Sequence, residues 1–340
     1  MSQTRNTQPL LRVENLRVEF PTRRGTLVAV DDISFHIDEG EVLGVVGESG
    51  AGKSLTGAAI IGLLEPPGRV ADGQIVFDGK RIDNLSYEKM RRLRGDQIAM
   101  VFQDPLTSLN PLYTIGKQLT ETIRTHVSMD ERGALARAIE LLNEVGIPAA
   151  ERRVDQFPHQ FSGGMRQRVV IALALAANPR LIIADEPTTA LDVSIQAQII
   201  SLLKRLCREH GTAVMLVTHD MGVIAETADR VAVMYAGRIV EIGPVQDVIK
   251  RAQHPYTHGL MGSIPVIRHD VERLTQIDGA MPRLTDIPPG CAFNPRCPRV
   301  FEYCRVERPE LMEVGATRAA CWLFDEAREQ AGGRTLREAP

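Results

Sequence analysis

The chain has 340 residues and a formal net charge of −3, and its length suits one large domain plus a smaller one. No long basic run is present, so the composition does not suggest a nucleic-acid partner. The polar N-terminus (1–10) lacks the apolar region of a signal peptide, and the longest apolar stretch, 169–177, is too short to span a bilayer. Any membrane role therefore depends on a partner protein.

Alternating apolar and polar residues over 11–20, 27–30 and 33–37 predict strands of an antiparallel β layer. The apolar strand expected over 42–46 leads into a glycine-rich loop, and 53–64 has the pattern of a helix stopped by a Pro-Pro-Gly turn. Further along, the expected strands are 98–102, 181–184, 213–218, 231–235 and 239–242, and the expected helical stretches are 116–146, 166–177, 194–209 and 221–228. This alternation predicts an α/β fold with a mainly parallel sheet covered by helices on both faces.

The loop over 47–54 matches G-x-x-x-x-G-K-S/T, and it follows a strand and precedes a helix, as that motif requires. In such a loop backbone N–H groups cradle phosphates, the lysine reaches the β- and γ-phosphates, and the hydroxyl ligates Mg²⁺. The alternative, a chance glycine turn, is rare at ordinary glycine frequency. The nucleotide-binding residues predicted here are Gly47, Ser49, Gly50, Gly52, Lys53 and Ser54.

The apolar strand over 181–184 is followed by two carboxylates, Asp185 and Glu186. Asp185 suits the Mg²⁺ shell, and Glu186 suits a general base that polarises the attacking water. Two acids at a strand end are usually a solvated edge, but downstream of a phosphate loop the catalytic interpretation is favoured.

A second turn suited to phosphate, Ser162-Gly163-Gly164, precedes the helix expected over 166–177, and we call it the serine–glycine turn. At a helix start such a turn presents free backbone N–H groups and a hydroxyl to an anion. Because a phosphate loop already lies upstream, this turn points to the nucleotide of a partner. The expected assembly is two such chains that sandwich ATP.

With these motifs the chain resembles the nucleotide-binding subunits of ATP-binding cassette (ABC) transporters, over nearly its whole length. The resemblance rests on the phosphate loop, Gln103, the serine–glycine turn, Asp185-Glu186, Ala190-Leu191-Asp192 and His219, in the family's order. It implies a P-loop NTPase core with a helical subdomain, and ATP and Mg²⁺ as cofactors.

The resemblance also implies roles for the matching residues. Gln103 would bind Mg²⁺ and the lytic water and couple the site to the membrane subunit, and His219 would contact the γ-phosphate. The serine–glycine turn would contact the γ-phosphate held by the opposite subunit, and Asp192 would lie in the loop that communicates across the dimer. Phe20 occupies the place of the aromatic that stacks on adenine, although a strand-end phenylalanine is more often part of the core.

The serine–glycine turn departs from the family pattern on either side. Phe161 stands where the family usually has leucine, and Met165 stands where it usually has glutamine. Ser162 and the glycine backbones remain, so the essential donors are present and we expect a working composite site.

Four further segments resemble the peptide/nickel branch of importers, and within it the first ATPase subunit of dipeptide and oligopeptide permeases. They are 103–111, 186–192, 235–237 and 254–257. The branch implies a peptide importer at the cytoplasmic face of the inner membrane, with three kinds of partner: a second, different ATPase subunit, two transmembrane permease subunits and an external substrate-binding protein. Nickel or another small solute is an alternative cargo. A non-transport ABC ATPase is disfavoured, since neither a long coiled coil nor a second fused cassette is present.

Four cysteines, Cys291, Cys297, Cys304 and Cys321, lie close together in the C-terminal part. A cytosolic chain would not keep structural disulfides, so four clustered thiols suit metal ligands. Their spacing lacks the paired C-x2-C of common zinc ribbons, and four thiolates suit either a 4Fe-4S cluster or Zn²⁺. The resemblance favours the iron–sulfur cluster, with Zn²⁺ and metal-free thiols as alternatives.

The expected domain organisation has its boundary near Arg251, because beyond 254–256 the periodicity weakens and prolines dominate. An ATP-binding cassette domain would cover 1–250, with its helical subdomain at about 104–176. A small loop-rich, cysteine-containing domain would follow over 251–330, and a mobile tail over 331–340.

Overall fold

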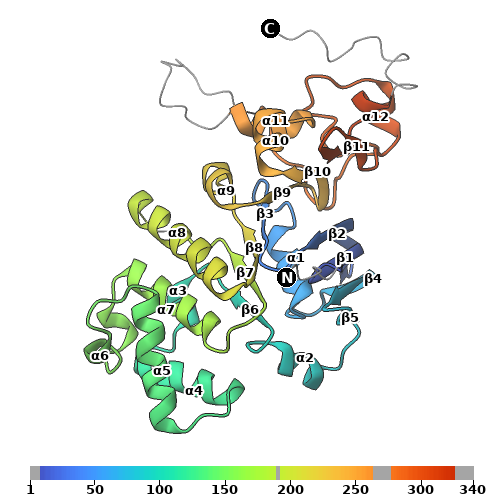
Figure 1. Cartoon of the computed structure of the whole chain (residues 1–340). Coiled ribbons are helices and arrows are strands. Elements are labelled where there is room, and N and C mark those ends of the chain that lie inside the picture. Colours follow the sequence, from blue (N-terminus) through green and yellow to red (C-terminus); the bar gives the residue numbers. More distant parts are fainter. Residues whose placement is uncertain (1–7, 189–191, 263–276, 326–340) are drawn as a thin grey trace, which may run out of the picture.

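The computed structural model describes residues 8–188, 192–262 and 277–325. Figure 1 shows a central sheet with a helical region (green) to one side, an antiparallel sheet (blue) to the other, and the C-terminal part (orange to red) above. Ala190 and Leu191, which precede Asp192 in the motif, and the expected tail over 331–340 lie outside the described residues.

The antiparallel sheet contains four strands in the order β2-β1-β4-β5. They are β1 (Leu11–Thr22), β2 (Gly25–Ile37), β4 (Arg69–Phe77) and β5 (Lys80–Arg81). Leu11 and Val13 are buried while Arg12 between them is exposed, and this alternation is what predicts β1 from the sequence. The two short strands expected over 27–30 and 33–37 form one continuous strand, β2.

The main sheet has eight strands in the order β11-β12-β10-β9-β3-β8-β7-β6. They are β3 (Val42–Val46), β6 (Ile98–Val101), β7 (Leu181–Asp185), β8 (Ala213–Val217), β9 (Arg230–Tyr235), β10 (Arg238–Pro244), β11 (Met312–Val314) and β12 (Thr317–Ala319). The run from β9 to β6 is parallel, and β10 to β12 add an antiparallel edge. All five residues of β7 are buried, because both faces of a parallel sheet are covered.

The first helix, α1 (Lys53–Ile60), contacts β7 and β8 of the main sheet and β1 of the other sheet, so it lies between the two sheets. It ends four residues before the expected position. Gly62 has φ 67 and its N–H donates to Ala59 O, while the Leu63 N–H donates to Ala58 O. This is a glycine-terminated helix end, which stops α1 before the prolines are reached.

The helical region is a bundle of short helices rather than one long helical stretch. Its members are α3 (Pro105–Ser108), α4 (Ile115–His126), α5 (Glu131–Glu144), α6 (Ala150–Arg153) and α7 (Gly163–Leu175). The expected stretch 116–146 is divided because the Asp130 carboxylate accepts the Gly133 N–H and caps a new helix start. Outside the bundle lie α2 (Tyr87–Leu93), α8 (Val193–His210) and α9 (Met221–Thr227).

The C-terminal part is built onto the main sheet and shares its core. Strand β12 pairs with β10, and Tyr256 and Phe293 are buried in the same cluster as Val46. The other elements there are α10 (Val245–Lys250), α11 (Pro255–Gly262), α12 (Glu302–Val306) and the 3-10 turn Trp322–Phe324. Within the described ranges, no helix combines the length and apolar character needed to cross a bilayer.

Candidate functional site

The phosphate loop connects β3 to α1 and depends on two glycines. Gly47 has φ 153, and a Cβ there would lie 2.2 Å from the carbonyl oxygen of Met234. Gly52 has φ 99, and a Cβ there would lie 3.0 Å from the carbonyl oxygen of Ala29. Only glycine fits both the backbone angles and the close approach of neighbouring strands, so packing dictates the shape of the loop.

Lys53 begins α1, and its ammonium is directed into the loop. Its Nζ donates to the carbonyl oxygens of Gly47 at 2.8 Å and Glu48 at 3.0 Å. Burial lowers the pKa of Lys53, and the carboxylates of Glu186 and Asp185 oppose that shift. A desolvated cation with carboxylates nearby is suited to bind the phosphates of Mg-ATP.

Ser54 and Asp185 come from distant parts of the sequence and meet beside the loop. The Ser54 hydroxyl donates to Oδ1 of Asp185 at 2.8 Å. Burial raises the pKa of the Asp185 carboxyl, and the hydrogen bond from Ser54 opposes that shift. A hydroxyl and a carboxylate held together provide the oxygen ligands that Mg²⁺ prefers, so these residues fit the metal.

Gln103, Glu186 and His219 follow the neighbouring parallel strands β6, β7 and β8 at one edge of the sheet. Nε2 of Gln103 donates to Oε2 of Glu186 at 3.3 Å, and Nδ1 of His219 lies 3.5 Å from Oε1. Glu186 has φ 44, a left-handed conformation that is uncommon for glutamate, and its N–H donates to Val217 O at 2.8 Å. Backbone strain of this kind concentrates at functional sites.

The serine–glycine turn lies elsewhere, at the N-terminus of α7. The Ser162 hydroxyl caps the helix by accepting the Met165 N–H at 3.4 Å, and Ser162 and Gly163 are exposed. Phe161 is buried beneath the turn. In the described part of the chain, no hydrogen bond joins this turn to the phosphate loop over 47–54. The structure therefore brings the phosphate loop, Asp185 and Glu186 together, while the serine–glycine turn faces solvent elsewhere.

The two remaining predicted nucleotide-site residues are peripheral. Phe20 is half-buried in β1 and packs against the core of the antiparallel sheet, and its predicted stacking on adenine stays a prediction. Asp192 is exposed and precedes α8 at its N-cap position, where its side chain makes no capping hydrogen bond.

The four C-terminal cysteines line one small hollow of about 10 Å³, together with His254 and Trp322. Burial raises the pKa of each thiol, to about 11 for Cys291. Four cysteine thiols are a chemically suitable ligand set for a thiolate-bound metal, and all four line one hollow. Across the described residues, however, no group of three or more His, Cys, Asp or Glu side chains is spaced to hold a metal ion.

Two contacts to the phosphate loop are not predicted by any motif. Arg296, which lies beside the cysteine Cys297 in the sequence, pairs with Glu48 at 2.9 Å, and the Tyr256 hydroxyl accepts the Glu48 N–H at 2.9 Å. The 254–257 segment indicates the transporter branch, but nothing in its sequence predicts the hydrogen bond between Tyr256 and Glu48.

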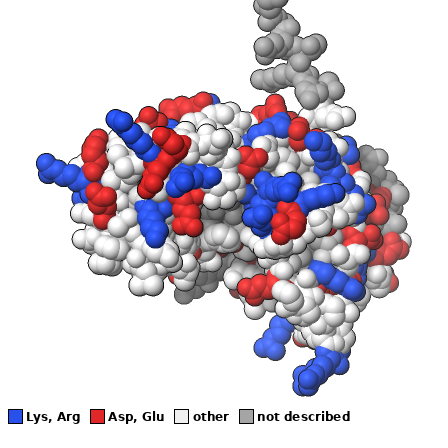
Figure 2. Space-filling view, turned by 90° about the horizontal axis from the view of Figure 1, so that it is seen from below, with Lys and Arg blue, Asp and Glu red and all other residues white. Residues whose placement is uncertain are grey.

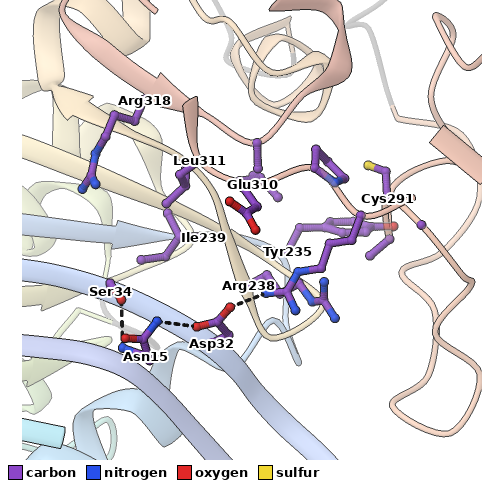
Figure 3. Close-up of a pocket in the computed structure, with 16 residues that line it drawn as sticks. Asn15, Asp32, Ser34, Tyr235, Arg238, Ile239, Cys291, Glu310, Leu311 and Arg318 are labelled. Atoms are coloured by element: carbon purple, nitrogen blue, oxygen red, sulfur yellow. Dashed lines mark hydrogen bonds and ion pairs between the residues drawn. The ribbon is translucent and has the colours of Figure 1, made fainter. Parts of the chain in front are cut away.

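A separate cavity of about 280 Å³ lies between the antiparallel sheet and the C-terminal part (Figure 3). Its lining combines apolar side chains such as Ile239 and Leu311 with the charged Asp32, Arg238 and Glu310. The cavity shares no residue with the phosphate loop. On the face shown in Figure 2, lysine and arginine side chains are interspersed with aspartate and glutamate.

A phosphate loop, a strand-end carboxylate pair and an exposed serine–glycine turn together define an ATP-binding cassette. The profile described as "ABC transporter" matches residues 30–189, and that described as "Oligopeptide/dipeptide transporter, C-terminal region" matches residues 240–304. The chain belongs to the ABC transporter family, in the oligopeptide/dipeptide branch, and is an ATPase.

Relatives align over almost the whole chain. The oligopeptide transport ATP-binding protein OppD of Bacillus subtilis is 50% identical over 93% of this chain and 89% of its own length. The dipeptide transport ATP-binding protein DppD of Escherichia coli is 48% identical over 89% and 92%. Among solved structures, the dimeric post-hydrolysis state of the cassette MJ0796 bound to ADP and Pi superposes with a TM-score of 0.63 at 30% identity, over 69% of this chain and 98% of that one.

Proposed function

We propose that the chain is the ATP-hydrolysing subunit of a bacterial importer of di- and oligopeptides. The observation that carries this proposal is the division of the site. The phosphate loop, Asp185 and Glu186 lie together, while Ser162 and Gly163 face solvent on another part of the molecule. The relatives described above are named as oligopeptide and dipeptide transport ATP-binding proteins, which supports the peptide cargo.

Each residue of the assembled half has a proposed part in hydrolysis. The N–H groups of Ser49 and Gly50 and the Lys53 ammonium bind the phosphates. When Mg²⁺ is bound, Ser54, Asp185 and Gln103 hold it, and the metal neutralises developing charge on the phosphate oxygens. Glu186 accepts a proton from the attacking water, and His219 steadies the Glu186 carboxylate and contacts the γ-phosphate.

The exposed half is proposed to act on the nucleotide of a second ATPase subunit. The Ser162 hydroxyl and the N–H groups of Gly163 and Gly164 contact that partner's γ-phosphate, and Asp192 lies in the loop that communicates across the interface. ATP binding closes the head-to-tail pair and hydrolysis reopens it. We propose a heterodimer of two different ATPase subunits, as the branch resemblance implies.

The membrane partners are proposed to dock beside Gln103. The segment around it exposes large apolar side chains: Phe102, directly before Gln103, is 46% exposed, and Leu106 and Leu112, after it, are 63% and 79% exposed. Apolar side chains clustered on a surface mark a protein interface. Two permease subunits would cover them and hold the chain at the cytoplasmic face of the inner membrane, and an external binding protein would deliver the peptide. Nickel is the second candidate cargo.

For the region over 251–330 we propose a C-terminal domain that carries a 4Fe-4S cluster on Cys291, Cys297, Cys304 and Cys321. The support is the donor set, because four thiols, two of them buried and two partly buried, line one hollow, and thiolate ligation is the usual binding mode of such clusters. When bound, the cluster supplies a structural cross-link between these loops. Zn²⁺ is the alternative, and the sulfurs must approach one another to bind either group.

The function is tested by purifying the complex that contains this chain and reconstituting it in liposomes with its binding protein. The expected result is ATP-dependent uptake of a labelled dipeptide, which is lost with Glu186→Gln. Uptake of Ni²⁺ but not peptide would move the assignment to the alternative cargo. ATP hydrolysis that is indifferent to membrane partners and ligand would contradict a transport role.

A further inference from the structure

The C-terminal part holds the phosphate loop directly, at Glu48. Nη1 of Arg296 lies 2.9 Å from Oε1 and 3.1 Å from Oε2 of Glu48, so both carboxylate oxygens are engaged. The backbone N–H of Glu48 donates to the Tyr256 hydroxyl at 2.9 Å. Glu48 is the second residue of the loop, directly after Gly47. Its side chain and its amide are therefore both bound by residues more than 200 positions away.

Arg296 is itself fixed in place by its surroundings. Its side chain is only 7% exposed, and it donates to Asp278 O at 2.9 Å, to Ile277 O at 3.3 Å and to the Tyr235 hydroxyl at 3.3 Å. The guanidinium also lies 5.8 Å from the ring centroid of Tyr235 and 5.9 Å from that of Phe293. A desolvated guanidinium held on several sides is a rigid anchor, because moving it would break several charge-assisted contacts at once.

The same cluster joins the loop to the end of the main sheet. Tyr235 is the last residue of β9, and its ring packs edge-on against Tyr256 at 4.7 Å and Phe293 at 5.3 Å. A Cβ at Gly50 would lie 3.1 Å from Cε of Met281, so a second loop residue also packs against the C-terminal part. The loop is thereby held at Glu48 and Gly50 by residues that follow position 250.

We propose that Arg296 is a positioning residue of the ATPase: through Glu48 it fixes the phosphate loop in its nucleotide-binding shape, so that ATP affinity depends on the C-terminal part. The inference rests on the proposed ATP site and adds to it a residue that the phosphate-loop motif does not contain. Arg296 does not touch nucleotide. Because Arg296 already restrains the loop, the loop loses less conformational freedom when its amides close on the phosphates, and nucleotide binds more tightly.

The test is nucleotide affinity of the full chain with Arg296→Gln, measured by calorimetry with Mg-ADP. We expect the Kd to rise about tenfold, because loss of a buried charge-assisted contact is worth about that factor. In the assembled transporter the KM for ATP should rise while kcat changes little. Arg305→Gln, an exposed arginine in α12 with no contact to the loop, is the matched control and should leave the Kd unchanged.

A double-mutant cycle separates positioning from general damage. Arg296→Gln also removes the donor to the Asp278 and Ile277 carbonyl oxygens, so its melting temperature without nucleotide should fall. Glu48 is 30% exposed, so the melting temperature of Glu48→Gln should change little. Glu48→Gln should weaken ADP binding by a similar factor, and the double variant should be no weaker than either single variant. Additive effects, or an unchanged Kd in Arg296→Gln, would overturn the proposal and leave the ATPase assignment intact. Failure of the unmodified chain to bind Mg-ADP would instead overturn the proposed function.

Discussion

Nε2 of Gln103 lies 3.3 Å from Oε2 of Glu186, although the two residues are 83 positions apart in the sequence. Parallel pairing of β6 with β7 brings them together, since the carboxyl ends of parallel strands meet at one edge of the sheet. The residue proposed to report to the membrane subunits thus contacts the proposed general base. A change in the position of Gln103 would alter the orientation of that carboxylate.

We predict that Glu186→Gln keeps ATP binding but lowers hydrolysis about a hundredfold or more, since the amide cannot accept the proton of the attacking water. The measurements are phosphate release by the assembled complex and ATP affinity by filter binding. The exposed Glu65 offers a matched control, and Glu65→Gln should hydrolyse normally. Near-normal turnover in Glu186→Gln would show that another group is the base.

Ser162→Ala should leave ATP bound at the chain's own phosphate loop with unchanged affinity, because the serine–glycine turn lies apart from that loop. Hydrolysis by the assembled pair should nevertheless fall about tenfold or more, through loss of a donor to the partner's nucleotide. Asp130→Ala removes a comparable helix cap, on α5, and costs about 1 kcal/mol of stability without touching the interface. If both variants reduce hydrolysis equally, the effect is one of stability and the turn has no role in the composite site.

Gly47→Ala should destabilise the fold and abolish nucleotide binding, because the new Cβ would lie 2.2 Å from the Met234 carbonyl oxygen. Gly211 also has a positive φ, 66, but a Cβ there meets nothing within 4 Å. Gly211→Ala should therefore cost only about 1 kcal/mol, from backbone strain alone. Urea unfolding of the two variants compares them, and an equal loss would contradict the packing of the loop against β9.

Anaerobically purified protein should contain iron and acid-labile sulfide and show a visible thiolate-to-iron absorption band. Cys304→Ser should lose all three signals, since each of the four thiols is a proposed ligand. Cys207, buried in α8 and absent from the cysteine hollow, provides the control, and Cys207→Ala should keep the iron. Stoichiometric zinc without iron would establish the alternative metal, and protein free of both metals would contradict the proposed cluster.

The sequence predicts best where one short segment carries both the pattern and the chemistry. The apolar strand ahead of Asp185 and the phosphate loop ahead of α1 have the structure that their residues predict. Local capping corrects the longer predictions: Gly62 ends α1 early, and Asp130 divides one helical stretch into two. Both signals are present in the sequence but are weaker than the apolar periodicity around them.

Contacts between distant segments could not be predicted in this way. The pairing of β12 with β10 depends on a strand of only three residues, which is too short for a sequence pattern to predict it. The Arg296–Glu48 pair joins residues 248 positions apart, and neither residue stands out in its own segment. Only the fold brings them together, which is why the C-terminal part looks separate in sequence but shares a core with the cassette.

The most direct test of the account is to purify this chain from native membranes in mild detergent and identify by mass spectrometry the proteins that accompany it. We expect two membrane-spanning permease subunits and a second, different ABC ATPase in equal amounts. A chain recovered without partners, or with ribosomes or DNA, would contradict the importer assignment.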